Sequence, residues 1–145
     1  MKLTEHFSFE ELTASEVALR HGVNNTPTDP QILGHLNLLA HKLEKVRELL
    51  GGPISISSAY RSSMVNTLVG SKPTSAHVKG LAADFTCPSF GTPKDIVEKI
   101  IKSNIDYDQV IYEYERWVHI GFSEEGYVPR KQALTIDNKG TRLYT

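Results

Sequence analysis

The segment from Ser75 to Asp84 limits the fold of this chain more than any other stretch. It holds His77 and Asp84 seven residues apart, whereas a helical pair of metal ligands stands four residues apart. Gly80 lies between them and permits a sharp turn of the backbone. The following residues, 81–86, alternate as in a strand. We therefore expect a loop that folds the His77 imidazole back over a strand presenting the Asp84 carboxylate.

Hydrophobic periodicity predicts one long helix and several short ones. Ser8 with Glu11 forms a capping-box pattern that begins a short helix ending before position 21. Further helical segments are expected within 62–69 and over 92–103. The long helix ends at Gly-Gly-Pro, residues 51–53. Its apolar face, with alternating four- and three-residue steps, comprises Ile32, Leu36, Leu39, Leu43, Val46 and Leu50.

Alternating, branched and aromatic residues predict the strands. The two stretches after position 108 are separated by two charged residues, so they are either a tight hairpin or one bent strand. The stretches with strand character are 54–60, 81–86, 109–114 and 117–122, with weaker edge-strand patterns at 133–136 and 142–144.

Length and composition indicate a single domain spanning residues 1–145. A chain of 145 residues can bury a core without cross-links, and Cys87 is its only cysteine, which excludes a disulfide framework and zinc sites built from cysteine pairs. The net charge of -1 and mixed signs argue against nucleic acid as a partner. The N-terminus lacks the apolar run of a signal peptide, and no stretch approaches a membrane span. We expect synthesis in the cytoplasm and no membrane insertion.

Three side chains form a candidate metal site: His77, Asp84 and His119. Two imidazoles and one carboxylate are typical zinc ligands, and a catalytic zinc keeps its fourth position for water. The competing interpretation is that His77 is a surface histidine and that Asp84 pairs with Arg61. The sequence around the two residues decides between these interpretations.

Ser75, His77, Gly80, Ala82 and Asp84 fill the pattern Ser-x-His-x-x-Gly-x-Ala-x-Asp. In this pattern the chain resembles the zinc peptidases that include VanY-type D-alanyl-D-alanine carboxypeptidases and phage L-alanyl-D-glutamate endolysins, and most closely their compact phage and bacterial branch. The similarity spans residues 54–123, which would be the core of the metal site. Further matching blocks are Ser58-Ala-Tyr-Arg61, Asn66-Thr-Leu-Val-Gly70-Ser71, Asp108-Gln-Val-Ile-Tyr-Glu113 and Trp117-Val-His119.

The resemblance implies an α+β fold, with a small and mainly antiparallel sheet flanked by helices, as in hedgehog and D-Ala-D-Ala peptidase domains. It also implies that His77, Asp84 and His119 bind Zn²⁺. The catalytic mechanism of such an enzyme needs a general base to reach a zinc-activated water.

Glu113 and Glu115 are the two candidates for the general base. On an uninterrupted strand both would face the same side as His119, so periodicity does not choose between them. Similarity to the hedgehog zinc domain favours Glu113, six residues before the ligand histidine. Several relatives instead place the acid three residues before it, where this chain has Arg116.

Three further residues are candidates for catalytic or substrate-binding roles in the cleft. Arg61 would be catalytic there, stabilising an oxyanion, or would bind a substrate carboxylate; the alternative is a salt bridge at a strand end. Ser75 would contact substrate or hold the His77 loop through its hydroxyl. Trp117 would form a wall of the substrate groove or belong to the core.

These features predict a zinc metallopeptidase that hydrolyses an amide bond in the peptide stem of peptidoglycan, as a D-Ala-D-Ala carboxypeptidase or an endopeptidase. A phage endolysin, monomeric, acting on the bacterial cell wall and exported with a holin, fits the resemblance; a bacterial origin stays open. The alternative function is a non-catalytic zinc-containing binding or structural module. A serine hydrolase using Ser75 is disfavoured because no nucleophile elbow surrounds that residue.

Overall fold

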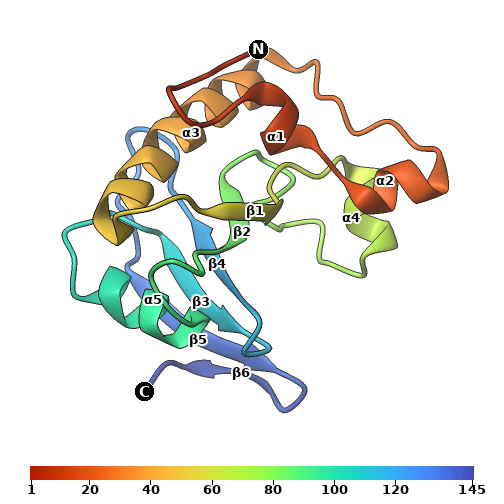
Figure 1. The fold of residues 1–145 in the computed structure, drawn as a ribbon. Coiled ribbons are helices and arrows are strands. Elements are labelled where there is room, and N and C mark those ends of the chain that lie inside the picture. Colours follow the sequence, from red (N-terminus) through yellow and green to blue (C-terminus); the bar gives the residue numbers. More distant parts are fainter.

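The computed structural model describes residues 1–145, with five helices and six strands (Figure 1). None of the helices is both long and apolar enough to cross a bilayer. The helices are α1 (Phe9–Thr13), α2 (Glu16–His21), α3 (Pro30–Leu50), α4 (Ser63–Leu68) and α5 (Pro93–Ile101). The strands are β1 (Ser55–Ser58), β2 (Ala82–Thr86), β3 (Gln109–Glu113), β4 (Trp117–Gly121), β5 (Gln132–Asp137) and β6 (Gly140–Leu143).

All six strands join one sheet in the order β1-β2-β4-β3-β5-β6. Four of the five neighbouring pairs are antiparallel, and only β3 and β5 run parallel. The predicted α+β class with a small, mainly antiparallel sheet is confirmed. The weak patterns near the C-terminus also form strands, β5 and β6. Because β4 lies between β2 and β3, residues from three consecutive strands of the sheet can share one site.

The strands β3 and β4 form a tight hairpin, and the alternative of one bent strand is wrong. Glu113 pairs with Trp117 at the last step of the ladder. Tyr114 and Glu115 make the turn at φ values of 53° and 61°, and the Arg116 amide donates to the carbonyl oxygen of Glu113. This turn ends the strand after Glu113, so Glu115 does not continue its alternation.

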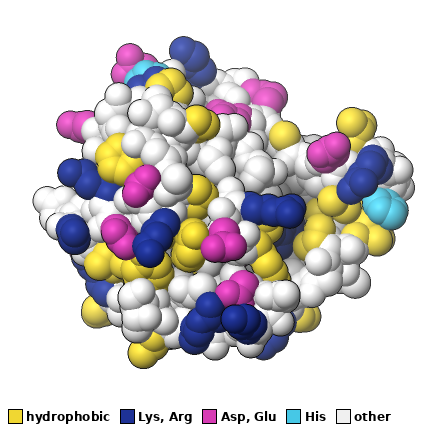
Figure 2. Space-filling view, turned by 60° about the horizontal axis from the view of Figure 1, so that its bottom comes forward, with side chains coloured by type: hydrophobic (Ala, Val, Ile, Leu, Met, Phe, Trp, Pro, Cys, Tyr) yellow, Lys and Arg dark blue, Asp and Glu magenta, His cyan; other side chains and the backbone are white.

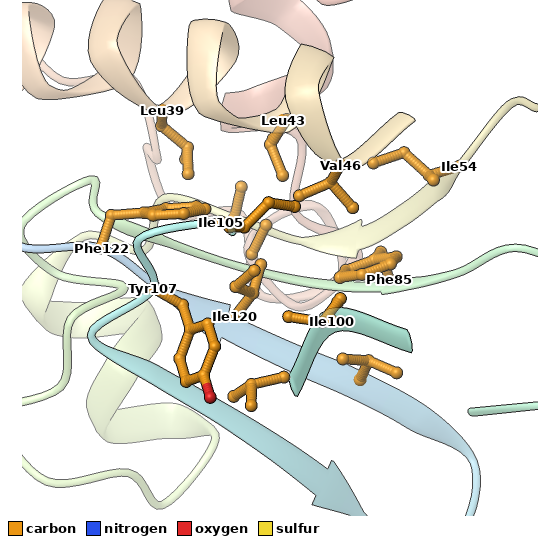
Figure 3. Close-up of a cluster of buried hydrophobic side chains, with 14 of the residues drawn as sticks. Leu39, Leu43, Val46, Ile54, Phe85, Ile100, Ile105, Tyr107, Ile120 and Phe122 are labelled. Carbon is orange, nitrogen blue, oxygen red and sulfur yellow. The ribbon is translucent and has the colours of Figure 1, made fainter. Parts of the chain in front are cut away.

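The long helix α3 forms because its ends are capped and one face is apolar. The Asp29 side chain accepts from the Gln31 amide at the start, and Gly51 ends the helix in the left-handed conformation with φ of 71°. The apolar stripe of α3 packs toward the sheet, as Figure 3 shows for Leu39, Leu43 and Val46. Helix α5 contacts β3, β4 and α3, so both helices cover the same face of the sheet.

Side chains alternate between the two faces of the sheet, which separates the core from the polar residues. Phe85 and Ile120 point into the hydrophobic core beneath the helices (Figure 3), Val118 belongs to the same core cluster, and all three are fully buried. Asp84 and His119, one residue along each strand, therefore point to the opposite face. The helices thus bury one face and leave the other available for a site.

The expected single short helix after Ser8 is instead two helices. Ser8 caps α1, as its hydroxyl accepts from the Glu11 amide. The chain then becomes extended at Ala14, and the Ser15 hydroxyl accepts from the Ala18 amide to begin α2. The second N-cap breaks the helix because a serine side chain competes with the backbone for amide hydrogen bonds.

The exposed charges follow the balanced composition of the chain. Figure 2 turns the lower side of Figure 1 toward the reader and shows acidic and basic side chains interspersed with hydrophobic ones. No single sign of charge dominates this face.

The packing of Gly80 against α3 predicts an unequal effect of two glycine substitutions. Gly80 has a φ of 76°, and an added Cβ would lie 3.3 Å from Cγ of Leu36. Gly22 has a φ of 64° with open space around it. We expect Gly80→Ala to lower the free energy of unfolding by about 2 kcal/mol and Gly22→Ala by about 1 kcal/mol, measured by urea denaturation. Equal losses would contradict the proposed contact with α3.

Candidate metal centre

His77, Asp84 and His119 meet on the open face of the sheet. The register of β2 and β4 sets Asp84 opposite His119, and the loop before β2 brings His77 over them. Oδ1 of Asp84 lies 3.2 Å from Nε2 of His77 and 3.0 Å from Nδ1 of His119. One ligand atom from each residue lies within 4.8 Å of the other two, and all three side chains are buried. The structure therefore assembles the three residues that the sequence singles out.

The loop that carries His77 is a compact turn held against α3. The amides of Val78 and Gly80 donate to the carbonyl oxygens of Ser75 and His77, and Gly80 takes the positive φ that ends the turn. Nδ1 of His35, on α3, lies 2.7 Å from the carbonyl oxygen of Lys79. The expected turn at Gly80 is present, and α3 packs against it.

The hydrogen bond of His77 to the backbone determines which ring nitrogen faces Asp84. Nδ1 lies 2.6 Å from the carbonyl oxygen of Ala59, and a carbonyl oxygen can only accept, so Nδ1 carries the hydrogen. Burial lowers the pKa of His77 and favours the neutral ring. The neutral ring then presents the lone pair of Nε2 to the Asp84 carboxylate.

A divalent cation fits between these groups. Burial alone would raise the pKa of Asp84, but the close contacts of its carboxylate with the rings of His119 and His77 outweigh this effect and hold that pKa below its usual range. An ionised carboxylate and an imidazole lone pair 3.2 Å apart require a positive species between them, either a proton or a metal ion. Two nitrogens and one carboxylate oxygen form a donor set suited to zinc.

Arg61 adds a positive charge next to the carboxylate. Its Nη2 lies 3.5 Å from Oδ2 of Asp84, the oxygen that the histidines do not contact. Its Nε donates to Ser58 Oγ at 3.2 Å, and its backbone amide donates to the His77 carbonyl oxygen. Arg61 therefore approaches Asp84, as in the salt-bridge interpretation, and it also lines the cleft, where a catalytic or substrate-binding role remains a prediction.

Glu113 lies at the end of β3, beside the histidine of β4. Its Oε1 is 3.9 Å from Nδ1 of His119, and its Oε2 accepts a hydrogen bond from Nε1 of Trp117 at 3.0 Å. Burial raises the pKa of Glu113, and the negative charge of Asp84 raises it further. Glu115 is exposed on the hairpin turn and does not line the cleft. Of the two glutamates, only Glu113 is therefore placed beside the metal ligands.

Ser75 takes both of its expected positions, whereas Trp117 takes only one of its two, at the cleft. The Ser75 hydroxyl accepts from the His77 amide at 3.3 Å, which holds the loop, and the residue also lines the cleft. Trp117 is half-buried, lines the cleft and orients Glu113. It is absent from the hydrophobic core.

A cleft of about 890 Å³ runs along this face of the sheet. The loop of residues 69–77 forms one side, and strands from β2 to β6 contribute the rest. The cleft residues from the sequence prediction are Arg61, Ser75, His77, Asp84, Glu113, Trp117 and His119. The cleft is large enough for several residues of a peptide.

Sequence reasoning missed two buried asparagines that support the site. The Asn25 side chain donates to the carbonyl oxygens of Thr13 and Tyr60, and its Oδ1 accepts from the Ser62 amide at 2.7 Å. It thus fixes the backbone on both sides of Arg61. Position 25 falls in a stretch rich in asparagine, threonine and proline, so only burial identifies its role. Asn66 contacts the Arg61 side chain itself.

A His-Asp-His cluster next to a half-buried glutamate, on one face of a mainly antiparallel sheet, fits the class of zinc metallopeptidases. A model of the Peptidase M15 family matches residues 5–121, and the chain belongs to this family. Enzymes of this family depend on zinc, so zinc is the cofactor. A comparison with curated proteins gives no match.

The ligand geometry predicts that zinc stabilises the fold through Asp84. Zinc at about 1,000 times its dissociation constant should raise the free energy of unfolding by about 4 kcal/mol, measured by urea denaturation with and without the metal. In Asp84→Ala only two ligands remain, and most of this increment should vanish. Asp137→Ala, which removes a partly exposed carboxylate on β5 that pairs with Arg142, should keep it. If zinc raises the free energy of unfolding of Asp84→Ala as much as that of the wild type, the metal binds elsewhere.

Proposed function

We propose that the chain hydrolyses an amide bond in the peptide stem of peptidoglycan, with His77, Asp84 and His119 as zinc ligands and Glu113 as general base. The observation that carries the proposal is the position of Glu113. Its carboxylate, which has a raised pKa, lies 3.9 Å from His119 of the candidate metal site in an open cleft, and this supports a role in taking a proton from a water molecule there.

Different residues of this chain carry out different steps of the proposed hydrolysis. Zinc, when bound, would polarise the amide carbonyl and lower the pKa of a water molecule. Glu113 accepts a proton from the attacking water and returns it to the leaving amine, so that one C–N bond breaks as one C–O bond forms. The Trp117 hydrogen bond to Oε2 leaves Oε1, the oxygen nearer to His119, free to take the proton.

Arg61 supplies positive charge to the reacting amide. Its guanidinium lies at the wall of the cleft, next to Asp84, where it stabilises the negative charge that develops on the carbonyl oxygen. Binding of a substrate carboxylate by the same group is the second role that its position supports.

The remaining cleft residues suit a short peptide with small side chains. Ser75 and Trp117 offer a hydroxyl and an aromatic surface to the peptide near the metal ligands. Ile111, Leu134 and Ile136 add apolar surface on β3 and β5, suited to the methyl groups of alanine. This composition supports a stem peptide as substrate.

The biological setting forms part of the proposal. We propose that residues 1–145 act as one monomeric zinc peptidase domain, supported by a core cluster that extends from Phe7 to Phe122. An endolysin that reaches the cell wall with the aid of a phage holin is the setting that the sequence resemblance favours. Carboxypeptidase and endopeptidase action differ in their products, a released terminal D-alanine or two peptide fragments.

Replacement of the proposed base tests the function. Glu113→Gln keeps the size of the side chain and its capacity to accept from Trp117, but it removes the proton acceptor. We expect hydrolysis of purified peptidoglycan to fall by about 100- to 10,000-fold while zinc stays bound, with products measured by mass spectrometry. Glu115→Gln, on the exposed turn, is the matched control and should keep wild-type activity.

Two outcomes would contradict the proposal. Full activity in Glu113→Gln would remove Glu113 from the mechanism. A wild-type protein that binds zinc but cleaves neither peptidoglycan nor its isolated stem peptides would favour the non-catalytic zinc module.

A further inference from the structure

Asn66 is a buried polar residue with no part in metal binding or proton transfer. It lies on α4, and only 2% of its surface is exposed. Its Oδ1 accepts from Nη1 of Arg61 at 3.2 Å, and its Nδ2 donates to the carbonyl oxygen of Lys72 at 2.8 Å. One side chain therefore joins the guanidinium of Arg61 to the loop that forms one side of the cleft.

The backbone of Asn66 also connects α4 to this loop. Its amide donates to the Ser62 carbonyl oxygen within α4, and its own carbonyl oxygen accepts from the Ser71 amide. The loop that leads on through Lys72 toward Ser75 is thus tied to Asn66 by two hydrogen bonds. This gives the side chain a defined position from which to hold Arg61.

An asparagine suits this position because it offers one donor and one neutral acceptor. An aspartate would keep an acceptor for Arg61 but would lose the donor to Lys72, and its charge would neutralise the guanidinium. Asp84 is already one negative partner of Arg61, at 3.5 Å. A neutral amide oxygen orients the guanidinium without adding a second carboxylate, so positive charge stays available in the cleft.

We propose that Asn66 is a positioning residue that aims the Arg61 guanidinium into the cleft and couples it to the loop of residues 70–74. This proposal rests on the proposed function, in which Arg61 stabilises charge on the substrate. It assigns to Asn66 an effect that acts through Arg61, which a purely structural role would not have.

A double-mutant cycle tests whether the effect of Asn66 on catalysis depends on Arg61. We expect Asn66→Ala to lower kcat for stem-peptide hydrolysis by about ten-fold with a smaller change in KM, because Arg61 loses a charged hydrogen bond. In an Arg61→Ala background, Asn66→Ala should cause almost no further loss. Thr67→Ala, on the exposed side of the same helix, should leave kcat unchanged. Equal fold-losses in both backgrounds, or an unchanged kcat in Asn66→Ala, would overturn the proposal.

The variant Asn66→Asp serves if the alanine variant fails to fold, because it keeps the size of the side chain and an acceptor for Arg61. We expect a folded protein with a lower kcat, since the new carboxylate neutralises Arg61; a wild-type kcat would overturn the proposal.

A measurement on the metal-free protein separates this proposal from the proposed function. The guanidinium ¹⁵N resonances of Arg61 should be resolved in the wild type, since three partners restrict the group, and should average in Asn66→Ala. Identical Arg61 resonances in both proteins would overturn the positioning role, whether or not the wild type hydrolyses peptidoglycan. Absence of hydrolysis in the wild type, with the expected change in these resonances, would overturn only the proposed function.

Discussion

The antiparallel register of β2 and β4 is the constraint on which the site depends. It places Asp84 directly opposite His119, so that their side chains leave the sheet on the same face. A shift of one residue would turn one of the two into the core and bring an apolar neighbour such as Phe85 or Ile120 out to the cleft. Burial of those neighbours under α3 and α5 therefore stabilises the register, and the register in turn fixes the positions of two of the three proposed metal ligands.

The third ligand depends on contacts that cross from the helices to the open face. Gly80 packs against Leu36 of α3, and His35 contacts the carbonyl oxygen of the preceding residue, Lys79, so the turn that carries His77 packs on the long helix. The His77 ring is then oriented by the Ala59 carbonyl oxygen. Such a hydrogen bond to the distal ring nitrogen fixes the tautomer and raises the basicity of the ligating nitrogen. The helix that builds the core thus also determines the geometry of the metal centre.

Much of this arrangement follows from local sequence, because it depends on short-range patterns. The apolar steps of α3 and the turn at Gly80 are visible as periodicity and as one glycine. The order of the strands in the sheet cannot be recognised in this way, because β3 pairs in parallel with β5, a strand that does not follow it directly in the sequence. The choice between Glu113 and Glu115 also lay beyond strand periodicity, because two positive φ angles at the hairpin turn end the alternation.

The supporting asparagines illustrate a second limit. Asn25 and Asn66 each join segments that are not adjacent in sequence, and their importance lies in burial and in the partners of their amides. No spacing rule identifies such a residue, since most of its partners are backbone groups present in every chain. The ligands, by contrast, are recognisable because zinc accepts few side-chain types.

Zinc-edge anomalous diffraction from crystals of the zinc-loaded protein tests the central claim most directly. We expect one strong peak about 2.0 to 2.2 Å from Nε2 of His77, a carboxylate oxygen of Asp84 and Nδ1 of His119, with Glu113 beside it but not bound. A peak held by other residues, or coordination that includes Glu113 in place of one of these three, would contradict that claim.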